Sequence, residues 1–373
     1  MKRRDFLRDV SALAVASPVL SSCSSDIHHE QLLRDLRSPM SDQPVGDGGY
    51  YSSLLRELVR YSTLAPSSHN TQCWQFQLQP KLVSIMPDLT RRCPVVDPDD
   101  HHLFISLGCA AENLVHAALA NGLWAEPRFD SVGAGAIAIS LEPTRAQSSS
   151  FAAAIPVRQS TRGDYDNRPL SNEELRLLEL AGSSNHGGGI HLMLITEHRM
   201  AEKVLEYVVA GNTAQMNNAA FVKELKSWIR FSPQQADRTG DGLYAAASGN
   251  PAMPEWLGGQ MMNWFFTLRS ENERNIRQIR NSSGLAIFFS DVSDPEHWVE
   301  VGRCYQRFAL QATALGIRNA MLNQPVEVGT IRPHFATALG LGNARPDLVV
   351  RFGRGSLLPY SIRRPVSAVL DRV

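Results

Sequence analysis

The segment GCAAENLVHAALANGL at residues 108–123 has a counterpart, GRCYQRFALQATALGI, at residues 302–317. The apolar residues of the two segments have the same spacing, and a glycine stands near the end of each, Gly122 in the first and Gly316 in the second. Apolar residues three and four positions apart share one face of a helix, so both segments are predicted to be amphipathic helices. Only four of the sixteen residues are identical, so this pair alone is equally compatible with two unrelated helices.

A second pair of segments favours an internal duplication. Residues 58–65 match residues 174–181 at an offset of 116, whereas the first pair is offset by 194. The difference of 78 residues indicates additional chain in the second copy, between about residues 197 and 280. We therefore predict two copies of one unit, with a large insertion in the second.

The apolar pattern predicts the same order of elements in both halves, which is typical of an α+β fold. The elements expected in the first half are a helix at 54–64, a hairpin of strands at 74–78 and 82–85, a helix at 108–123 and a strand at 137–141. Those expected in the second half are a helix at 175–181, strands at 190–195 and 285–290, a helix at 302–317 and a strand at 348–352. The predicted halves are 49–145 and 150–373, related by a pseudo-twofold axis.

Composition excludes several classes of protein. The 373 residues include 37 Lys+Arg and 37 Asp+Glu, so the chain lacks the positive surplus of a general nucleic-acid binder. No apolar run approaches the roughly 20 residues that cross a bilayer, which excludes a multi-span membrane protein. The cysteines after Cys23 form no CxxC motif and are predicted to be small buried hydrophobic residues. We expect no metal site, because the adjacent His101 and His102 should point apart.

Residues 1–23 are predicted to be a signal peptide, since basic residues precede an apolar stretch too short to span a bilayer. Arg3 and Arg4, followed by Asp-Phe-Leu, resemble the twin-arginine export motif, although a Sec signal with a chance arginine pair is the alternative. The segment LSSC resembles a lipoprotein cleavage box in which Cys23 would be lipidated, unless the cysteine stands there by chance. Residues 24–48 are rich in Ser, Asp, Pro and Gly and predict a flexible tether.

Two polar stretches lie between predicted elements. The stretch APSSHNTQCW at residues 65–74 follows the first helix, and its short side chains and backbone amides could meet a polar ligand. The stretch RQSTR at residues 158–162 precedes the second half's first helix, where guanidinium groups and a hydroxyl could hold a phosphate. Taken separately, the first could equally be an ordinary turn and the second a surface loop.

Together, the two stretches resemble motifs of the nitroreductase-like flavoproteins. In that family an RxSxR loop opens the fold, PSxxNxQPW follows the first long helix, and FMN lies between two subunits. The chain is most similar to the duplicated, single-chain Acg-like branch, whose C-terminal pattern also recurs as LNQPVEV at 322–328 and VVRFGRGSLLPYSIRRPV at 349–366. The resemblance covers most of residues 50–370 and implies a nitroreductase-like fold duplicated in one chain.

The resemblance implies one FMN site between the halves. The residues implied to bind the cofactor are Pro66, Ser67, Ser68 and Asn70 at the flavin, Arg158, Gln159, Ser160 and Arg162 at its phosphate, Asn323, Gln324 and Pro325 at the reactive ring edge, and Arg363 and Arg364 as further phosphate contacts. The chain departs from the family at Cys73, where a proline is expected, and at Gln159, where a second arginine is common. The counterpart turn at residues 181–185 lacks the Gln-Pro-Trp ending, so the second site is expected to be lost.

The resulting functional hypothesis is an exported, periplasmic or envelope-associated FMN oxidoreductase that reduces a planar acceptor such as a nitroaromatic or quinone. The flavin carries out hydride transfer itself, so no side chain is assigned as an acid or base. The chain is expected to act as a monomeric pseudo-dimer, with membrane contact only through Cys23. A flavin-sequestering protein and a non-catalytic envelope scaffold are the alternatives. The insertion is predicted either to cover the site as a lid or to fold around its own small core.

Overall fold

The computed structural model describes residues 27–40, 49–184 and 188–371. The predicted signal peptide and Cys23 lie outside these described residues. One described helix, α3 (His101–Ala120), is long and apolar enough to cross a membrane, but 72% of its apolar window is buried inside the protein. This burial is that of a core helix.

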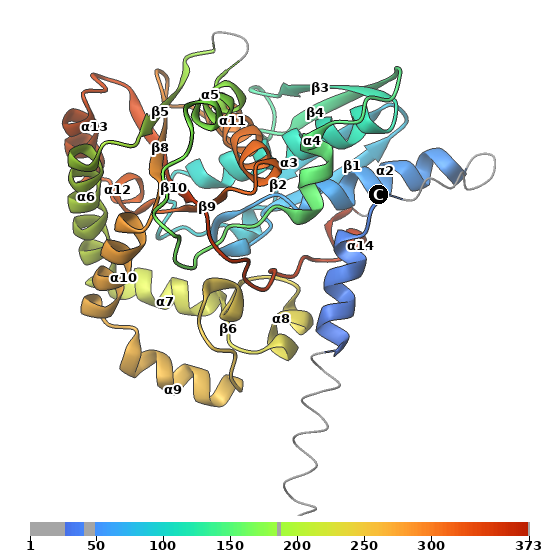
Figure 1. The fold of residues 1–373 in the computed structure, drawn as a ribbon. Coiled ribbons are helices and arrows are strands. Elements are labelled where there is room, and N and C mark those ends of the chain that lie inside the picture. The colour runs from blue at the N-terminus through green and yellow to red at the C-terminus, as the bar shows by residue number, and fades with distance from the viewer. Residues whose placement is uncertain (1–26, 41–48, 185–187, 372–373) are drawn as a thin grey trace, which may run out of the picture.

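The structure contains two four-stranded antiparallel sheets with the same strand order (Figure 1). The first sheet has the order β1 (Trp74–Gln79), β2 (Leu82–Pro87), β4 (Ile137–Pro143) and β3 (Leu123–Phe129). The second has the order β5 (Ile190–Ile195), β8 (Gly284–Ser290), β10 (Arg345–Gly353) and β9 (Arg318–Met321). Numbered within its own half, each sheet has the order one, two, four, three. The predicted duplication of one α+β unit is therefore confirmed.

The two halves meet at α3 and α11 (Pro295–Ala314), which pack against each other in the centre of the molecule. A Cβ atom on Gly108 of α3 would lie 2.0 Å from the carbonyl oxygen of Val299, and one on Gly302 of α11 would lie 2.0 Å from that of Ile105. Only glycine permits so close an approach of two backbones. The two contacts are equivalent, because Gly302 lies 194 residues after Gly108 and Val299 lies 194 residues after Ile105. The helix pair therefore has the predicted pseudo-twofold symmetry.

The remaining helices of the two halves cover the sheets and extend the central pair. Helix α2 (Gly49–Thr63) contacts α3, and α5 (Asn172–Gly182) and α4 (Ser150–Ala154) contact α11. The C-terminal part adds α12 (Gln324–Glu327), α13 (Arg332–Leu339) and α14 (Val366–Val369). A single large apolar core runs through both halves, and it contains three of the four described cysteines. All four are free and buried, as predicted.

The additional chain of the second half lies between β5 and β8. It forms α6 (His198–Met216), α7 (Ala219–Trp228), α8 (Pro233–Thr239), α9 (Glu255–Phe265) and α10 (Leu268–Arg280), with short strands β6 (Ile229–Arg230) and β7 (Leu243–Tyr244). The equivalent strands of the first half, β1 and β2, are joined by the two-residue turn Pro80-Lys81. Figure 1 shows α7, α8 and α9 below the two sheet-bearing halves.

Three features differ from the sequence-based expectations. Strands β3 and β9 were not predicted, because both are edge strands with weak signals: β3 contains Pro127, and β9 has only four residues. Helix α3 begins seven residues earlier than predicted, at His101. Residues 27–37 form a helix whose leucines pack against the insertion, so the prediction of a flexible tether is wrong for this part.

Candidate functional site

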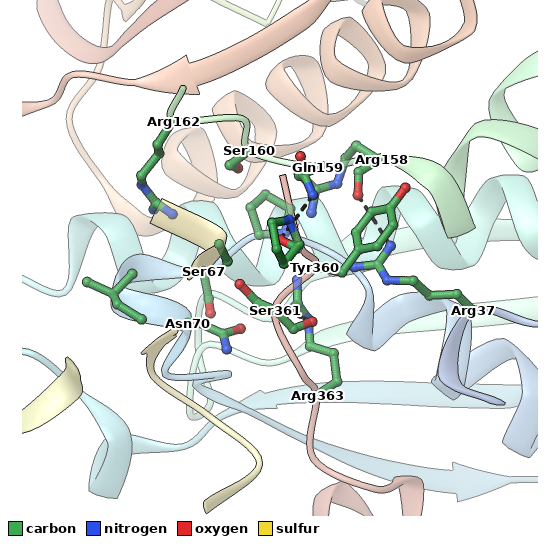
Figure 2. A pocket seen from close by; sticks show the side chains of 14 residues that line it. Arg37, Ser67, Asn70, Arg158, Gln159, Ser160, Arg162, Tyr360, Ser361 and Arg363 are labelled. Carbon is green, nitrogen blue, oxygen red and sulfur yellow. Dashed lines mark hydrogen bonds between the residues drawn. The ribbon is translucent and has the colours of Figure 1, made fainter. Parts of the chain in front are cut away.

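The two polar stretches identified in the sequence converge on one pocket (Figure 2). Its lining residues come from five segments of the chain: Arg37; Pro66, Ser67 and Asn70; Arg158, Gln159, Ser160 and Arg162; Leu243 and Ala247; and Pro359, Tyr360, Ser361 and Arg363. The pocket offers the centre of a water molecule about 40 Å³. Because one water needs roughly 10–15 Å³ of such space, the pocket has room for a few water-sized groups.

The turn after α2 is built from residues in an uncommon backbone conformation. His69, Asn70 and Gln72 have positive φ angles of 49°, 55° and 54°. Non-glycine residues adopt such angles only where surrounding contacts impose them, and they are concentrated at functional sites. Here Ser67 Oγ accepts a hydrogen bond from the Gln72 amide at 2.9 Å, and Gln72 Nε2 donates to the Gly240 carbonyl at 2.8 Å.

Asn70 joins this turn to two distant segments. Its Nδ2 donates to the carbonyl oxygens of Gly242 in the insertion, at 3.0 Å, and Ile362 near the C-terminus, at 3.2 Å. Its Oδ1 is buried without a hydrogen-bond partner in the described residues. The Asn70 side chain therefore has one unused acceptor at the pocket.

The arginine loop contributes donors that the protein leaves unused. Arg158 is only 2% exposed, and its Nη2 donates to the Leu64 carbonyl oxygen at 3.0 Å. Its Nε and Nη1 are buried without partners in the described residues. The described part of the chain supplies no hydrogen bond or ion pair to the Arg162 side chain. A buried guanidinium group with unpartnered donors is costly, so Arg158 favours an anionic ligand, and the half-buried Arg162 adds a second positive charge at the same pocket.

The pocket concentrates positive charge and is lined by no carboxylate. Burial lowers the pKa of Arg37 to about 9, with Arg158 as the next cause. Burial, followed by repulsion from Arg274, lowers the pKa of Arg162 to about 10. The pKa of Arg363 is held well below its usual value by burial and then by Arg37 and Arg158. These directions show that holding four guanidinium groups together is unfavourable, and a bound anion would relieve that cost.

Comparison with known proteins agrees with this geometry. No family model matches the chain. Two curated proteins, from Mycobacterium tuberculosis strains CDC 1551 / Oshkosh and ATCC 25618 / H37Rv, have names that assign them provisionally to the NAD(P)H nitroreductases. Each is 24% identical over 336 residues, which cover 85% of this chain and 91% of the relative. This chain is related to the nitroreductase-like family.

Two solved nitroreductases are weakly similar to this chain in structure. A nitroreductase with bound FMN from Desulfitobacterium hafniense DCB-2 has a TM-score of 0.38 at 15% identity, covering 61% of this chain and 100% of that chain. The FMN-dependent nitroreductase NfnB from Mycobacterium smegmatis, in complex with NADPH, has a TM-score of 0.36 at 12% identity, covering 56% and 88%. The fold of this chain is defined by its own two sheets and their shared strand order.

The two C-terminal arginines have different positions in this nitroreductase-like chain. Arg363 lines the pocket, with its Nε donating to the Thr63 carbonyl oxygen at 2.8 Å and its Nη2 to that of Ala65 at 3.1 Å. The Arg364 side chain instead contacts the Ala368 carbonyl oxygen and does not line the pocket. Of the predicted pair, only Arg363 is therefore placed to act on a ligand there.

The residues predicted at the ring edge do not line this pocket. Asn323 accepts a hydrogen bond from the Val349 amide at 3.0 Å and donates through Nδ2 to His102 Nε2 at 3.2 Å. Gln324 and Pro325 follow it in α12, and the backbone of Gln324 is so close to Gly211 that a Cβ there would lie 2.6 Å from it. Burial, followed by the charges of Arg162 and His102, lowers the pKa of His69 in the turn after α2 to about 4.

Two further predicted residues have mainly structural contacts. Ser68 begins the short 3-10 turn after Ser67 and does not line the pocket. Gln159 lines it, but its amide holds the C-terminal segment: Oε1 accepts from the Leu358 amide at 3.0 Å and Nε2 donates to the Leu358 carbonyl at 2.6 Å. This bidentate contact explains how a glutamine can stand where the family commonly has an arginine.

The expectation that His101 and His102 point apart is wrong. Their rings lie edge to face at 4.6 Å, and ligand atoms of both lie within 4.8 Å of one another and of Asp97. The reason is the start of α3, where Asp97 accepts the amides of His102 and Leu103, both at 3.0 Å. His101 Nε2 also contacts Asp347 Oδ1 at 2.8 Å. The cluster is therefore a buried network of hydrogen bonds. It holds the start of α3 in place and, through His102, the side chain of Asn323.

A second pocket on the central helices differs in charge. Its cavity volume is about 400 Å³, counted as the space that the centre of a water molecule can occupy. Its lining includes Arg303 and Arg307 together with Glu112 and Glu300. Glu112 pairs with Arg303 at 2.9 Å and with Arg307 at 3.3 Å. Arg307 also donates to the Ala181 carbonyl oxygen near the end of α5. Arg363 makes a similar contact with the Thr63 carbonyl oxygen at the end of α2. The arginines of this pocket are already paired with carboxylates.

The sequence analysis missed Arg37 and Tyr360. Both line the pocket, and the Arg37 guanidinium carbon lies 3.9 Å from the centre of the Tyr360 ring. No motif marks Arg37, because it lies in a segment whose composition predicted a tether. Tyr360 was quoted within the C-terminal pattern, but nothing in that pattern distinguished it from its neighbours.

Proposed function

We propose that this chain is an FMN-binding oxidoreductase whose cofactor phosphate is held in the arginine-lined pocket. The observation that carries the proposal is the pair of unpartnered, buried Arg158 donors in a pocket with four arginines and no carboxylate. A dianionic phosphate is the ligand chemistry that such donors recognise best. The family motifs support a flavin as the carrier of that phosphate, and the names of the relatives support nitroreductase activity.

The residues fit the cofactor at its phosphate end. Arg158 and Arg162 would bind the phosphate oxygens, while Asn70 Oδ1 would accept a hydrogen bond from the cofactor and so orient it. Leu243 and Ala247 of the insertion would exclude water from one side. When bound, FMN supplies the capacity to accept and donate a hydride, so the protein contributes binding, orientation and electrostatics.

We propose that the acceptor is a planar small molecule such as a nitroaromatic or a quinone, and that the chain works as a monomer with two pseudo-equivalent halves. We also propose that it is exported by the twin-arginine route and tethered to the cell envelope through a lipidated Cys23. Support for the export route is the RRDFL motif, and a folded, cofactor-loaded protein is the cargo that this route carries.

Flavin sequestration with little turnover is the second candidate, and one observation favours it. The pocket is small, with about 40 Å³ open to the centre of a water molecule, and Leu243 and Ala247 of the insertion are among its lining residues. A complete flavin can enter only if these residues or their neighbours move. If the insertion then closes over the ring, the cofactor would be held without access for a second substrate.

The visible spectrum of the purified chain tests both candidates. Flavin absorption bands that bleach with a reductant and recover on addition of a nitroaromatic or a quinone are expected for the oxidoreductase. Bands that bleach but recover only slowly, at the same rate with and without acceptor, would support sequestration. Absence of any flavin band, even after incubation with FMN, would overturn the proposal.

A further inference from the structure

We propose that the N-terminal helix at residues 27–37 is part of the cofactor site, and that Arg37 at its end binds the phosphate of FMN. This inference rests on the proposed function and extends it to a segment that the family motifs do not include. It makes Arg37 a determinant of the preference for FMN over riboflavin, because riboflavin lacks the phosphate.

The helix is firmly attached to the insertion and to the C-terminal segment. Its residues Leu32, Leu33 and Leu36 pack against a small core formed by Ala236, Tyr244, Ala247 and Ile362. His29 Nδ1 contacts Asp237 Oδ1 at 2.5 Å, and His29 is only 5% exposed. One member of this small core, Ala247, also lines the pocket, and so do Ser361 and Arg363 on either side of Ile362. Docking of the helix and shaping of the pocket are therefore coupled.

The end of the helix is fixed where Arg37 enters the pocket. Arg60 of α2 donates through Nη1 to the Leu36 carbonyl oxygen at 2.7 Å. The Arg37 guanidinium then lies over the Tyr360 ring, and Figure 2 shows it at the end of the pocket opposite Arg162. Stacking on an aromatic face holds a guanidinium group in place without using its N–H donors.

Arg37 keeps donors for a ligand. Its hydrogen bonds to the Pro156 carbonyl, at 2.6 Å, and the Arg158 carbonyl, at 3.4 Å, both use Nη1. The structure gives its Nε and Nη2 no hydrogen bond in the described residues. Burial and the nearby Arg158 both oppose the Arg37 charge, and no carboxylate of the pocket compensates it. A dianion between Arg37 and Arg158 would satisfy both side chains.

Affinity for FMN and for riboflavin, measured by quenching of flavin fluorescence on the mature chain, tests this inference. Arg37→Ala is expected to weaken FMN binding roughly tenfold or more, as for loss of charged hydrogen bonds, and to leave riboflavin binding unchanged. Arg34→Ala is the matched control, since the Arg34 side chain is 60% exposed and faces Glu30 on the same helix. Inorganic phosphate should compete with FMN in the parent chain and less well in Arg37→Ala.

The outcomes separate the two proposals. If Arg158→Ala weakens FMN binding but Arg37→Ala does not, the inference about Arg37 is wrong and the proposed function stands. If the parent chain binds neither flavin, the proposed function fails first. Equal losses for FMN and riboflavin in Arg37→Ala would indicate damage to the pocket and would overturn a phosphate contact.

Hydrogen exchange supplies a second readout that does not depend on a substitution. Addition of FMN is expected to slow amide exchange in residues 27–37, because the bound phosphate fixes the end of the helix. Addition of riboflavin should have a much smaller effect there. Equal protection of the helix by both ligands, or by neither, would contradict the inference.

Discussion

Arg158 Nη2 donates a hydrogen bond to the carbonyl oxygen of Leu64 at 3.0 Å, although the two residues are 94 positions apart in the chain. Leu64 directly follows α2 and precedes the turn that contains Asn70, whereas Arg158 opens the arginine loop of the other half. The bond therefore fastens the two segments to each other without using the remaining Arg158 donors. This contact crosses the boundary between the halves and joins the two segments that line the pocket.

Removal of the two loop arginines should release the cofactor. We expect the Arg158→Ala/Arg162→Ala double variant to weaken FMN binding by about 100-fold or more, since each charged hydrogen bond contributes about 1.5–3 kcal/mol. Flavin absorbance remaining with the protein after gel filtration measures the effect. Arg176→Ala is the control, because Arg176 is exposed and pairs only with Glu173 on α5. Retention of FMN at unchanged affinity would show that the phosphate lies elsewhere.

Asn70 affects stability in two ways, through the hydrogen bonds of its side chain and through a backbone with positive φ, and two substitutions separate these effects. Both Asn70→Gly and Asn70→Ala lose the hydrogen bonds to Gly242 and Ile362, which should destabilise the fold by about 1–3 kcal/mol. Alanine should cost about a further 1–2 kcal/mol because φ is 55° at this position. Urea unfolding of the three proteins measures the difference. An alanine variant as stable as the glycine variant would contradict the backbone assignment.

The pseudo-twofold contact predicts matched effects at two glycines. Gly108→Ala and Gly302→Ala each place a methyl group 2.0 Å from a backbone oxygen, so the central helices must separate. We expect each substitution to destabilise the chain by about 3 kcal/mol or more, in the range of severe overpacking. Gly259→Ala in α9 has nothing within 4 Å and should be neutral or stabilising by up to about 1 kcal/mol. Strongly unequal effects at Gly108 and Gly302 would count against the symmetry.

Glu112 should make stability depend on pH. Burial acts to raise its pKa, but His116, whose Nε2 lies 3.2 Å from Glu112 Oε1, and the charges of Arg307 and Arg303 together hold the pKa well below its usual value. A depressed pKa in the folded state contributes stability above the unfolded value, near pH 4.3, and this contribution is lost as the pH falls further. At pH 7 the free energy of unfolding of Glu112→Gln should therefore be lower than that of the parent chain by about 3 kcal/mol. This difference between the two proteins should become smaller below pH 4.

Urea unfolding of the parent chain and of Glu112→Gln at pH 7 and at pH 3.5 provides the measurement. Glu126→Gln is a suitable control, because the Glu126 side chain is 50% exposed and pairs only with the exposed Arg128. A gap between the parent and Glu112→Gln that stays constant with pH would show that the glutamate acts through packing and not through its charge.

Local sequence pattern determined much of this fold. The turn at Pro80-Lys81, the helices at the centre and the 116- and 194-residue offsets were all readable, because periodicity and turn chemistry act over a few neighbouring residues. The resemblance of two short motifs to those of the nitroreductase-like flavoproteins, and not the apolar pattern, predicted that Asn70 and Arg158 share one site. The apolar pattern missed β3 and β9, whose pairing at the sheet edge depends on partners far along the chain.

Tertiary structure alone decided which side chains share the pocket. Arg37 entered it from a segment with no motif, while Arg364 was turned away from its neighbour Arg363 toward Ala368. Asn70 Nδ2 was used to hold the insertion, and His102 was directed to Asn323 by the capping of α3. Such convergence depends on the packing of helices and loops separated by tens to hundreds of residues. The order of residues determined the elements and their symmetry, and the distances between those elements determined the charge and shape of the site.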